Sequence, residues 1–559
     1  MVLILLSWVL LTAFFIPFGL FFQTILKIDN KNAGLIVFLG MFFQSLLLSI
    51  CCFFFNIGIK VFIVNFIFSV ILIFFYRKKI HYLINFFLSE INKSTFFSKL
   101  LLLFILISSL YKCSLKPFLV DNESYYVQTI KWINEYGFVK GLANLHVFLA
   151  QTSPLHVLQA GFNFNFWNNN FNDINGLILV TASSFFIIES EKYYLKYYKF
   201  HWINFVLIFN VLFFQFISQP SPDFALIIIS QIIFYLFIEE FDNSQAIKTS
   251  ILLFLFLFFI KITIAPIGLI ILIWIILKRR FFLFFVLSVF LITLILIFKN
   301  IIITGYPFYP FEYFPINIDW KIPTNLFHFI TNSTKNTGYF ENHIVINPTF
   351  VQKINGWLHL SGLNRVFNLG MIFLFILSMF TSEIRKNQNY RILYLVLLIH
   401  FVILLLTSPQ FRFFLPEFIF FSVLIFSNII NYLRSNLKII QILLILFIIF
   451  SSVFIEYFDF KKLTDNKLMQ ENTHFKLQNF LIPENNSRFD YLTFEKVKNG
   501  NLEYYSPTHN FFFFGTANGK LPCVNKYQIN YLKKYYQIRP QLRTKKLENG
   551  FFSEIIKQK

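Results

Sequence analysis

The sequence predicts an all-α polytopic membrane protein, and three observations support this fold class. Of its 559 residues, 57% are hydrophobic and only 13% are charged, and the mean hydropathy is +0.64. Apolar runs of about 20 residues, the length that crosses a hydrocarbon core of about 30 Å, recur along the chain. Lys and Arg gather in the short connections between these runs. We therefore expect about fourteen transmembrane helices, with interfacial helices in the first large outer loop and a small C-terminal α+β domain.

Each expected span is an apolar run bounded by polar or charged residues. The runs cover residues 3–22, 34–55, 60–76, 99–113, 174–190, 202–218, 223–239, 248–261, 264–278, 281–299, 367–381, 391–407, 414–431 and 437–455. The stretch 248–278 contains Lys261 and Pro266, so it forms either two short helices joined by a tight turn or one kinked helix. The N-terminal run lacks the charged start and the cleavage site of a signal peptide, so we expect an uncleaved first span.

Positive charge predicts the orientation of these spans. With fourteen spans, five basic clusters fall on one side of the membrane, which the positive-inside rule makes cytoplasmic. The clusters are Arg77, Lys78, Lys79, Lys93 and Lys99; Lys192, Lys196 and Lys199; Lys278, Arg279 and Arg280; Arg385, Lys386 and Arg391; and Arg434 with Lys438. Both termini and the segments 114–173, 300–366 and 456–559 then lie outside. We expect a multi-pass protein of the cytoplasmic (inner) membrane whose active face is extracytoplasmic.

The outer segments carry their own local signals. Residues 1–455 form the expected transmembrane domain, and residues 456–559, which are richer in charge, Gly and Pro, form a soluble extracytoplasmic domain. In that domain Asn510–Phe514 is a candidate buried strand, although its four Phe also suit a membrane surface. In the first outer loop, apolar residues at helical spacing predict amphipathic helices over 124–136, 142–150 and 156–164 that lie in the interface plane.

The net charge of +21 does not indicate nucleic-acid binding. Much of the excess lies in short loops, where it orients the spans, and there is no basic groove or recognised motif. Phe, Ile, Asn, Lys and Tyr are abundant everywhere, as in a biased genome. The cysteines Cys51, Cys52, Cys113 and Cys523 show no metal-ligand spacing, and three of them lie in or beside spans. We expect neither a metal cluster nor a disulfide framework from them.

Two acidic signals stand out on the predicted outer face. Asp121 and Glu123 follow the apolar run that ends near residue 113, and Asp223 ends the turn Gln219-Pro220-Ser221-Pro222-Asp223. Asp and Asn are favoured residues at helix N-termini, so each acid has a structural reading as a cap. In a helix, Glu123 would point away from Asp121, so both serve one site only if Asp121 precedes the helix.

Cations and aromatic residues join these acids on the same face. Lys261 lies in an apolar run, where a charge needs water or a partner, and snorkelling to the surface is its plain alternative. Arg412 lies in an apolar turn, and its planar fork of donors suits a phosphate or a lipid headgroup. Tyr306 and Tyr309, in Gly305-Tyr306-Pro307-Phe308-Tyr309-Pro310, are candidates for stacking on a sugar, or belong to the interfacial aromatic belt.

This order of features resembles the GT-C superfamily, the integral-membrane glycosyltransferases that use lipid-phosphate sugars. The resemblance rests on Asp121-x-Glu123 with Tyr125-Tyr126, Lys261, the Tyr306 to Pro310 segment, and Arg412 before Leu415-Pro416. The phrase Gly141-Leu142-Ala143-Asn144-Leu145-His146, followed by Ser153, is also similar to a sub-group of uncharacterised bacterial membrane proteins related to that superfamily. The acidic motif departs from the family in being Asp-Asn-Glu, and no substrate motif of a known branch is present.

The resemblance implies transfer of a sugar from a polyprenyl-phosphate donor to a glycan, lipid or protein acceptor, by inversion, in cell-surface polysaccharide biosynthesis. It makes Asp121 the base, Glu123 its partner or a metal ligand, and Arg412 and Lys261 the groups that face the donor phosphate. Asp223 has a weaker claim. It leaves open whether a divalent metal ion takes part. Membrane lipids, the donor and the acceptor are the expected partners, with no nucleic acid.

Two other functions compete with this hypothesis. A glycan polymerase or ligase would rely on Arg and His in large outer loops, here Arg365, His343 or His359. A transporter or flippase would act without covalent chemistry, but such proteins often carry paired repeats, and no repeat is visible. A non-catalytic scaffold is the remaining alternative.

Overall fold

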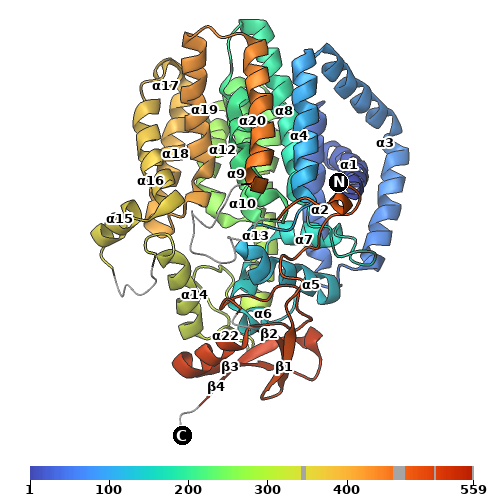
Figure 1. Ribbon diagram of the computed structural model, residues 1–559, viewed down its shortest axis with the longest axis vertical. Coiled ribbons are helices and arrows are strands. Elements are labelled where there is room, and N and C mark those ends of the chain that lie inside the picture. The colour runs from blue at the N-terminus through green and yellow to red at the C-terminus, as the bar shows by residue number, and fades with distance from the viewer. Residues whose placement is uncertain (342–347, 458–472, 509–510, 557–559) are drawn as a thin grey trace.

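Long apolar helices form the main body of the protein in the computed structural model, which describes residues 1–341, 348–457, 473–508 and 511–556 (Figure 1). In this part of the chain, ten helices are long and apolar enough to cross a membrane. They are α1 (Val2–Ile25), α2 (Ala33–Cys51), α3 (Ile59–Lys93), α4 (Phe96–Cys113), α8 (Ile174–Tyr197), α10 (Pro222–Glu239), α13 (Phe282–Thr304), α18 (Gln388–Thr407), α19 (Leu415–Tyr432) and α20 (Leu437–Tyr457). The protein is therefore a multi-pass membrane protein by helix length and hydropathy.

The other four expected spans are helical but differ from single long helices. Helices α15 (Phe350–Leu358) and α16 (Gly362–Ser378) form a pair bent by 109°, which adds an eleventh span if the pair counts as one. The remaining three apolar segments are η3 (Trp202–Phe209) with α9 (Asn210–Ile217), α11 (Ser244–Ile260), and η4 (Ile262–Ile267) with α12 (Gly268–Lys278). These shorter apolar helices have 10–17 residues. At about 1.5 Å per residue they fall short of a hydrocarbon core of about 30 Å, so the expectation of fourteen full spans was too high.

The stretch 248–278 folds as two short helices joined by a break, the first of the two alternatives. Lys261 ends α11 in an extended conformation, and the 3₁₀ turn η4 contains Pro266. Lys248, near the start of α11, donates to the carbonyl oxygen of Lys27, and Lys278, at the end of α12, pairs with Asp242. Both outer ends of the helix pair thus lie beside the loops of one end of the bundle, and the break at Lys261 lies at the far end of the hairpin.

A polar layer, comprising residues 114–173, 305–336, 473–508 and 511–556, packs against one end of the bundle, the lower end in Figure 1. Its helices are η1 (Asn122–Tyr126, a π-helix), α5 (Val127–Tyr136), α6 (Leu142–Leu145), η2 (Val147–Gln151), α7 (Pro154–Gly161), α14 (Thr324–Asn336), η7 (Leu477–Phe480), α22 (Lys526–Tyr531), η8 (Leu532–Tyr536) and η9 (Leu547–Asn549). The helices expected near 124–136, 142–150 and 156–164 are therefore present, the second as α6 followed by a 3₁₀ turn.

Two antiparallel hairpins complete the polar layer. Strands β1 (Phe494–Asn499) and β2 (Leu502–Pro507) pair in one sheet, and β3 (Ile538–Leu542) and β4 (Phe551–Ile555) pair in the other. The β1–β2 connection is the two-residue turn Gly500-Asn501, where Gly500 adopts a φ of +66° that favours glycine. The prediction of a strand at Asn510–Phe514 is wrong for Phe511–Phe514, which form a turn region. Asn510 lies outside the described residues.

The C-terminal region shares one hydrophobic cluster with the segments that precede it. Trp132 from α5 and Ile322 from the segment before α14 belong to the same buried cluster as Tyr504 and Phe551 from β2 and β4. Asn144 from α6 joins three segments, because it accepts a hydrogen bond from Ser553 Oγ and donates to the carbonyl oxygens of Gly141 and Trp320. The motif 141–146 therefore binds the polar layer together.

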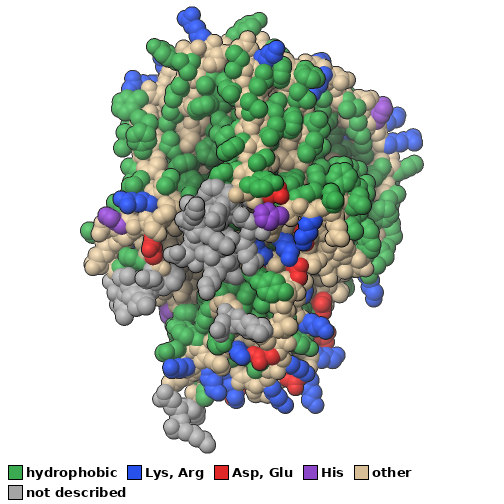
Figure 2. All heavy atoms as spheres, viewed as in Figure 1, with side chains coloured by type: hydrophobic (Ala, Val, Ile, Leu, Met, Phe, Trp, Pro, Cys, Tyr) green, Lys and Arg blue, Asp and Glu red, His purple; other side chains and the backbone are tan. Residues whose placement is uncertain are grey.

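The predicted basic clusters share the opposite end of the bundle, which we call the basic end. The backbone N–H of Thr95 donates to Glu191 at 2.6 Å, that of Phe200 donates to Asn431 at 2.7 Å, and Asn389 donates to the Ile238 carbonyl at 3.3 Å. The first two bonds join loops that carry clusters, and the third ties the loop after Arg385 to the end of α10, where Lys278 pairs with Asp242. Helix α17 (Ser382–Lys386) lies at the end opposite the β-strands in Figure 1, and Figure 2 shows the broad apolar surface between the two ends.

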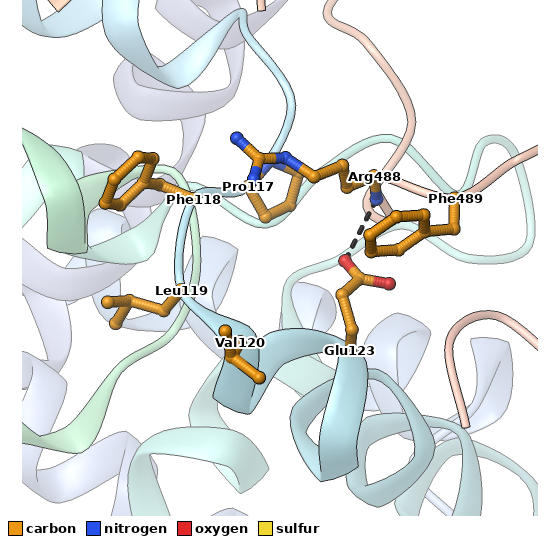
Figure 3. Close-up of a pocket in the computed structure, with 7 residues that line it drawn as sticks. All are labelled: Pro117, Phe118, Leu119, Val120, Glu123, Arg488 and Phe489. Atoms are coloured by element: carbon orange, nitrogen blue, oxygen red, sulfur yellow. Dashed lines mark hydrogen bonds between the residues drawn. The ribbon is translucent and has the colours of Figure 1, made fainter. Parts of the chain in front are cut away.

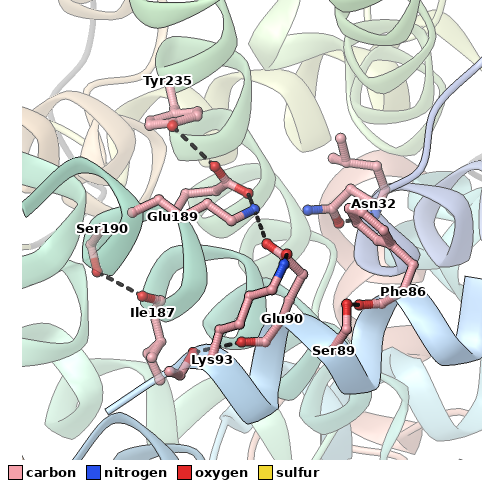
Figure 4. Close-up of polar contacts among 12 residues, drawn as sticks. Asn32, Phe86, Ser89, Glu90, Lys93, Ile187, Glu189, Ser190 and Tyr235 are labelled. Carbon is pink, nitrogen blue, oxygen red and sulfur yellow. Dashed lines mark hydrogen bonds and ion pairs between the residues drawn. The ribbon is translucent and has the colours of Figure 1, made fainter. Parts of the chain in front are cut away.

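One polar network fixes the last turns of α3 at the basic end. Lys192 on α8 lies 2.5 Å from Glu90 and 3.1 Å from Glu189, and Tyr235 on α10 donates to Glu189 at 3.4 Å (Figure 4). The end of α3 is thereby tied to the bundle.

Candidate functional site

Four ionisable side chains from four distant segments meet where the bundle joins the polar layer. Arg412 Nη1 lies 2.7 Å from Asp121 Oδ2 and 3.6 Å from Asp223 Oδ2, and Lys261 Nζ pairs with Asp223 Oδ1. The charges alternate in the order Asp121, Arg412, Asp223, Lys261. We call these four residues the charge cluster. Of the seven candidate site residues of the sequence analysis, the structure brings these four together.

Asp121 is presented by a distorted helical turn. It directly precedes the π-helix η1, and its backbone is already helical, with φ −59° and ψ −29°. Its carboxylate makes no capping hydrogen bond to this helix, so the reading of Asp121 as a plain cap does not describe it. Its side chain is about 31% exposed, as is that of Arg412. Asp121 is thus both held by a cation and open to a second molecule.

Asp223 is the buried acid of the cluster. It follows Pro222 in the first turn of α10, where a carboxylate also interacts favourably with the helix dipole. Asn175 on α8 holds the preceding turn by donating to the carbonyl oxygens of Gln219 and Ser221, both at 2.9 Å. With 3% of its side chain exposed, Asp223 is supported by both cations and is closed to bulk water.

The two cations flank one aromatic ring. Lys261 Nζ lies 4.3 Å and Arg412 Cζ lies 5.3 Å from the centroid of the Phe413 ring. Arg412 Nε also donates to Gln410 Oε1 at 3.0 Å, which sets the plane of its guanidinium. Lys261 therefore reaches a carboxylate instead of snorkelling to the surface, and Arg412 bridges two acids in addition to any contact with lipid.

Glu123 lies apart from the charge cluster. Its carboxylate accepts hydrogen bonds from Ser487 Oγ at 2.5 Å, from the Arg488 backbone N–H at 2.9 Å and from Asn122 Nδ2 at 2.8 Å. Figure 3 shows it directed at the Arg488–Phe489 segment. Burial raises the pKa of this carboxyl, and the three hydrogen bonds partly oppose that rise. Because Asp121 lies within a helical turn and not before it, the two acids point to different partners.

Tyr306 and Tyr309 belong to the interior of the polar layer. The Tyr306 hydroxyl donates to the Ile322 carbonyl at 3.1 Å, and its ring stacks on Phe327 with centroids 4.4 Å apart. The Tyr309 ring packs edge-on against the same Phe327 at 6.1 Å. These contacts give both tyrosines a packing role, and no contact joins them to the charge cluster in the described residues.

Three residues outside the predicted set support the cluster. Ser153 Oγ donates to the Ile260 carbonyl at 2.9 Å, directly before Lys261. His400 on α18 pairs with Glu417 on α19, and its Nε2 contacts the Thr263 carbonyl at 3.0 Å, just after Lys261. His400 and Glu417 are ionisable residues within apolar runs, and that costly placement was the available signal.

The residues expected of a polymerase or ligase lie elsewhere. His359 and Arg365 flank the bend between α15 and α16, where both are exposed, and neither is ion-paired within the described residues. His359 Nδ1 contacts the Asn355 carbonyl at 2.8 Å. His343 lies outside the described residues.

The charge cluster does not have the donor set of a metal centre. Among the described residues, no group of three or more His, Cys, Asp or Glu side chains lies together. The two carboxylates of the cluster already face Arg412 and Lys261, so a divalent ion would have to displace a fixed cation.

The fold and site define a multi-pass helical membrane protein with a charged cluster between its spans and a polar layer. The chain belongs to the family described as a domain of unknown function, DUF8201, whose model matches residues 1–420. This match includes the spans from α1 to α18, the start of α19 and all four residues of the charge cluster. No curated protein and no solved structure matches the chain.

Proposed function

We propose that this protein is a glycosyltransferase that moves a sugar from a polyprenyl-phosphate donor to an acceptor hydroxyl at the polar-layer side of the membrane. The observation that carries the proposal is the convergence of Asp121, Asp223, Lys261 and Arg412 from four remote segments. Placing four charges together at a membrane boundary is costly, because each loses solvation. Such an arrangement is typical of sites that bind and transform a charged substrate.

Arg412 and Lys261 provide the group that the donor requires. As the glycosidic bond breaks, negative charge develops on the departing phosphate, and fixed cations in a site of low dielectric stabilise it. Without donor, the carboxylates of Asp121 and Asp223 neutralise these cations. A phosphate that binds Arg412 competes with Asp121 for the guanidinium, because one Arg fork cannot serve three anions at full strength. Donor binding then loosens the hold on the Asp121 carboxylate.

Asp121 is the better base of the two acids. Its side chain is partly exposed, whereas Asp223 is buried under both cations. The Asp121 carboxylate takes the proton of the acceptor hydroxyl as the acceptor oxygen forms a bond to the anomeric carbon of the sugar. The bond from that carbon to the phosphate oxygen breaks, and the polyprenyl phosphate leaves with the electron pair. A single displacement of this kind inverts the anomeric centre.

Nearby histidine is poorly suited to this task. His156 on α7 packs beside Tyr126, with ring centroids 4.8 Å apart. Tyr126 itself lies five residues after Asp121 in the sequence. Burial, and then the charges of Lys299 and Lys261, lower the pKa of His156 to about 3. The His156 ring is fully buried and cannot meet an acceptor hydroxyl, whereas the Asp121 carboxylate is partly exposed, so Asp121 remains the candidate.

The test is sugar transfer by the purified full-length protein in proteoliposomes, supplied with a panel of polyprenyl-phosphate sugars and native membrane lipids as acceptors. We expect the wild type to form a glycosylated product. Asp121→Asn should lower the rate of transfer by at least about 10²-fold, the lower end of the range for loss of a general base. The matched control is Asp490→Asn, because Asp490 is also paired with a cation, Lys116 at 3.0 Å, and has similar exposure.

Full transfer by Asp121→Asn would remove the catalytic assignment, and loss in both variants would indicate structural damage. Flux of the lipid-linked sugar without a new glycosidic bond would favour the flippase alternative. Loss on substitution of His359 or Arg365, with Asp121→Asn active, would favour the polymerase or ligase.

A further inference from the structure

We propose that a basic cavity at the end of the bundle opposite the polar layer binds the headgroup of an anionic phospholipid. The cavity measures about 400 Å³ and lies between the end of α1, the α1–α2 loop, the start of α2 and the last part of α3. Its lining includes Lys27, Lys31 and Lys79. The proposal is independent of the glycosyltransferase function, because none of its residues belongs to the charge cluster.

The cavity has a cationic rim. Three lysines face one acidic residue, Asp29, so the charged lining carries a net +2. Among the described residues, none of the three lysines is ion-paired, and the closest polar contact of Lys79 is Thr24 Oγ1 at 3.5 Å. Uncompensated lysines around a hollow of this size are complementary to the phosphate of a headgroup.

The floor of the cavity is apolar. Leu20 from α1, Ile36 from α2 and Leu83 from α3 line it, and these three form a small buried hydrophobic cluster of their own. A free anion gains nothing from such a floor, whereas the glycerol backbone and the first acyl carbons of a lipid bury apolar surface there. The combination of cationic rim and apolar floor favours a lipid as the occupant.

The walls of the cavity are held in place. Gln23 donates to the Asn30 carbonyl at 3.1 Å, the Asp29 N–H donates to Gln245 at 3.1 Å, and Lys248 donates to the Lys27 carbonyl at 2.9 Å. Lys27 itself adopts a left-handed conformation with φ +52°, which costs energy for a residue with a side chain. The network around Glu90 fixes α3 about two turns beyond Leu83 (Figure 4).

The position of the cavity matches a membrane surface. The N-terminus contacts the polar layer, where the Leu3 N–H donates to the Leu481 carbonyl at 3.2 Å, so the other end of α1 reaches the basic end. Helix α3 has 35 residues, about 52 Å at about 1.5 Å per residue, and therefore extends beyond a hydrocarbon core of about 30 Å. Figure 2 shows Lys and Arg side chains along the outer edge of α3, where lipid headgroups would lie.

The experiment compares two lipids with identical acyl chains, phosphatidylglycerol and phosphatidylcholine, by native mass spectrometry of the full-length protein in neutral detergent. We expect preferential retention of phosphatidylglycerol. The triple variant Lys27→Gln/Lys31→Gln/Lys79→Gln should weaken its binding roughly 100-fold, because each lysine near an anionic lipid strengthens binding several-fold. The matched control is Lys196→Gln/Lys199→Gln/Lys386→Gln, which removes the same charge from exposed positions at the same end.

Three outcomes would overturn the proposal. They are equal affinity for the two lipids, equal weakening in both triple variants, and displacement of phosphatidylglycerol by millimolar inorganic phosphate, which would identify a site for a soluble anion. If the triple variant does not fold, the three single Lys→Gln variants replace it, and each should weaken binding several-fold. Unchanged binding in all three would equally contradict the assignment.

Discussion

At the scale of single residues, Asp121 and Glu123 lie two positions apart and have different environments. The Asp121 carboxylate faces Arg412 and is partly open, whereas Glu123 is buried and accepts three hydrogen bonds that hold the segment around Arg488. Backbone bonds strengthen the same junction, because the N–H groups of Thr516 and Ala517 donate to the Glu123 carbonyl at 2.9 and 2.8 Å. Glu123 therefore anchors the C-terminal region to the helix that carries Asp121.

This difference predicts losses of stability of different size for two substitutions. Glu123→Ala removes three hydrogen bonds to a buried carboxylate, so we expect a loss of about 3 kcal/mol in the free energy of unfolding. Asp121→Asn keeps the size of a partly exposed side chain, so we expect a loss of about 1 kcal/mol or less. Thermal unfolding in detergent and limited proteolysis near residue 488 measure both. Equal stability of the two variants would contradict the anchoring role of Glu123.

At the scale of elements, His146 links the short helices of the polar layer to the segment 511–514. Its Nδ1 accepts from the Phe148 N–H at 3.2 Å, so the proton lies on Nε2, which donates to the Phe514 carbonyl at 3.1 Å. Burial lowers the pKa of His146 to about 4, although the bond to Phe514 partly opposes this shift. The folded protein therefore keeps this histidine neutral.

The lowered pKa predicts how stability depends on pH. Below the usual pKa of about 6.5, the unfolded chain takes up a proton at His146 that the folded chain binds only near pH 4, so stability falls as pH falls through this window. Between pH 7 and pH 5 the expected loss is about 2 kcal/mol. The measurement is the difference in pH dependence of unfolding between the wild type and His146→Gln. An identical dependence would show that His146 does not titrate as described.

At the scale of the whole molecule, the chain is polarised along the bundle. The polar layer and charge cluster occupy one end, and the basic loops and the lysine-lined cavity occupy the other. The positive-inside rule then predicts that the basic end faces the cytoplasm. Any transfer reaction at the charge cluster would take place on the far side of the membrane.

Cysteine labelling in intact cells tests this orientation. We expect a membrane-impermeant maleimide to label Lys498→Cys, in β1, and to label Lys386→Cys, in α17, only after permeabilisation. Both lysines are exposed, and the wild type supplies the background, since three of its four cysteines are buried and Cys51 is partly buried. The reverse pattern would invert the predicted orientation.

Much of the architecture could be predicted from residue patterns. Hydrophobicity is a local property, so each of the fourteen apolar runs was found and each is helical. Their lengths were less predictable, because breaks such as the one at Lys261 depend on partners in other segments, here Ser153 and His400. The turn at Phe511–Phe514 was mistaken for a strand because a run of Phe suits either structure when its neighbours are unknown.

The candidate site divides in the same way. An ionisable residue in or beside an apolar run is visible in the chain itself, since it must find water or a partner, and this singled out Asp121, Asp223, Lys261 and Arg412. Which partner each one finds was decided by tertiary structure. The direction of a side chain depends on where its helical turn begins, so Asp121 meets Arg412, Glu123 meets Arg488, and the two tyrosines turn into the polar layer.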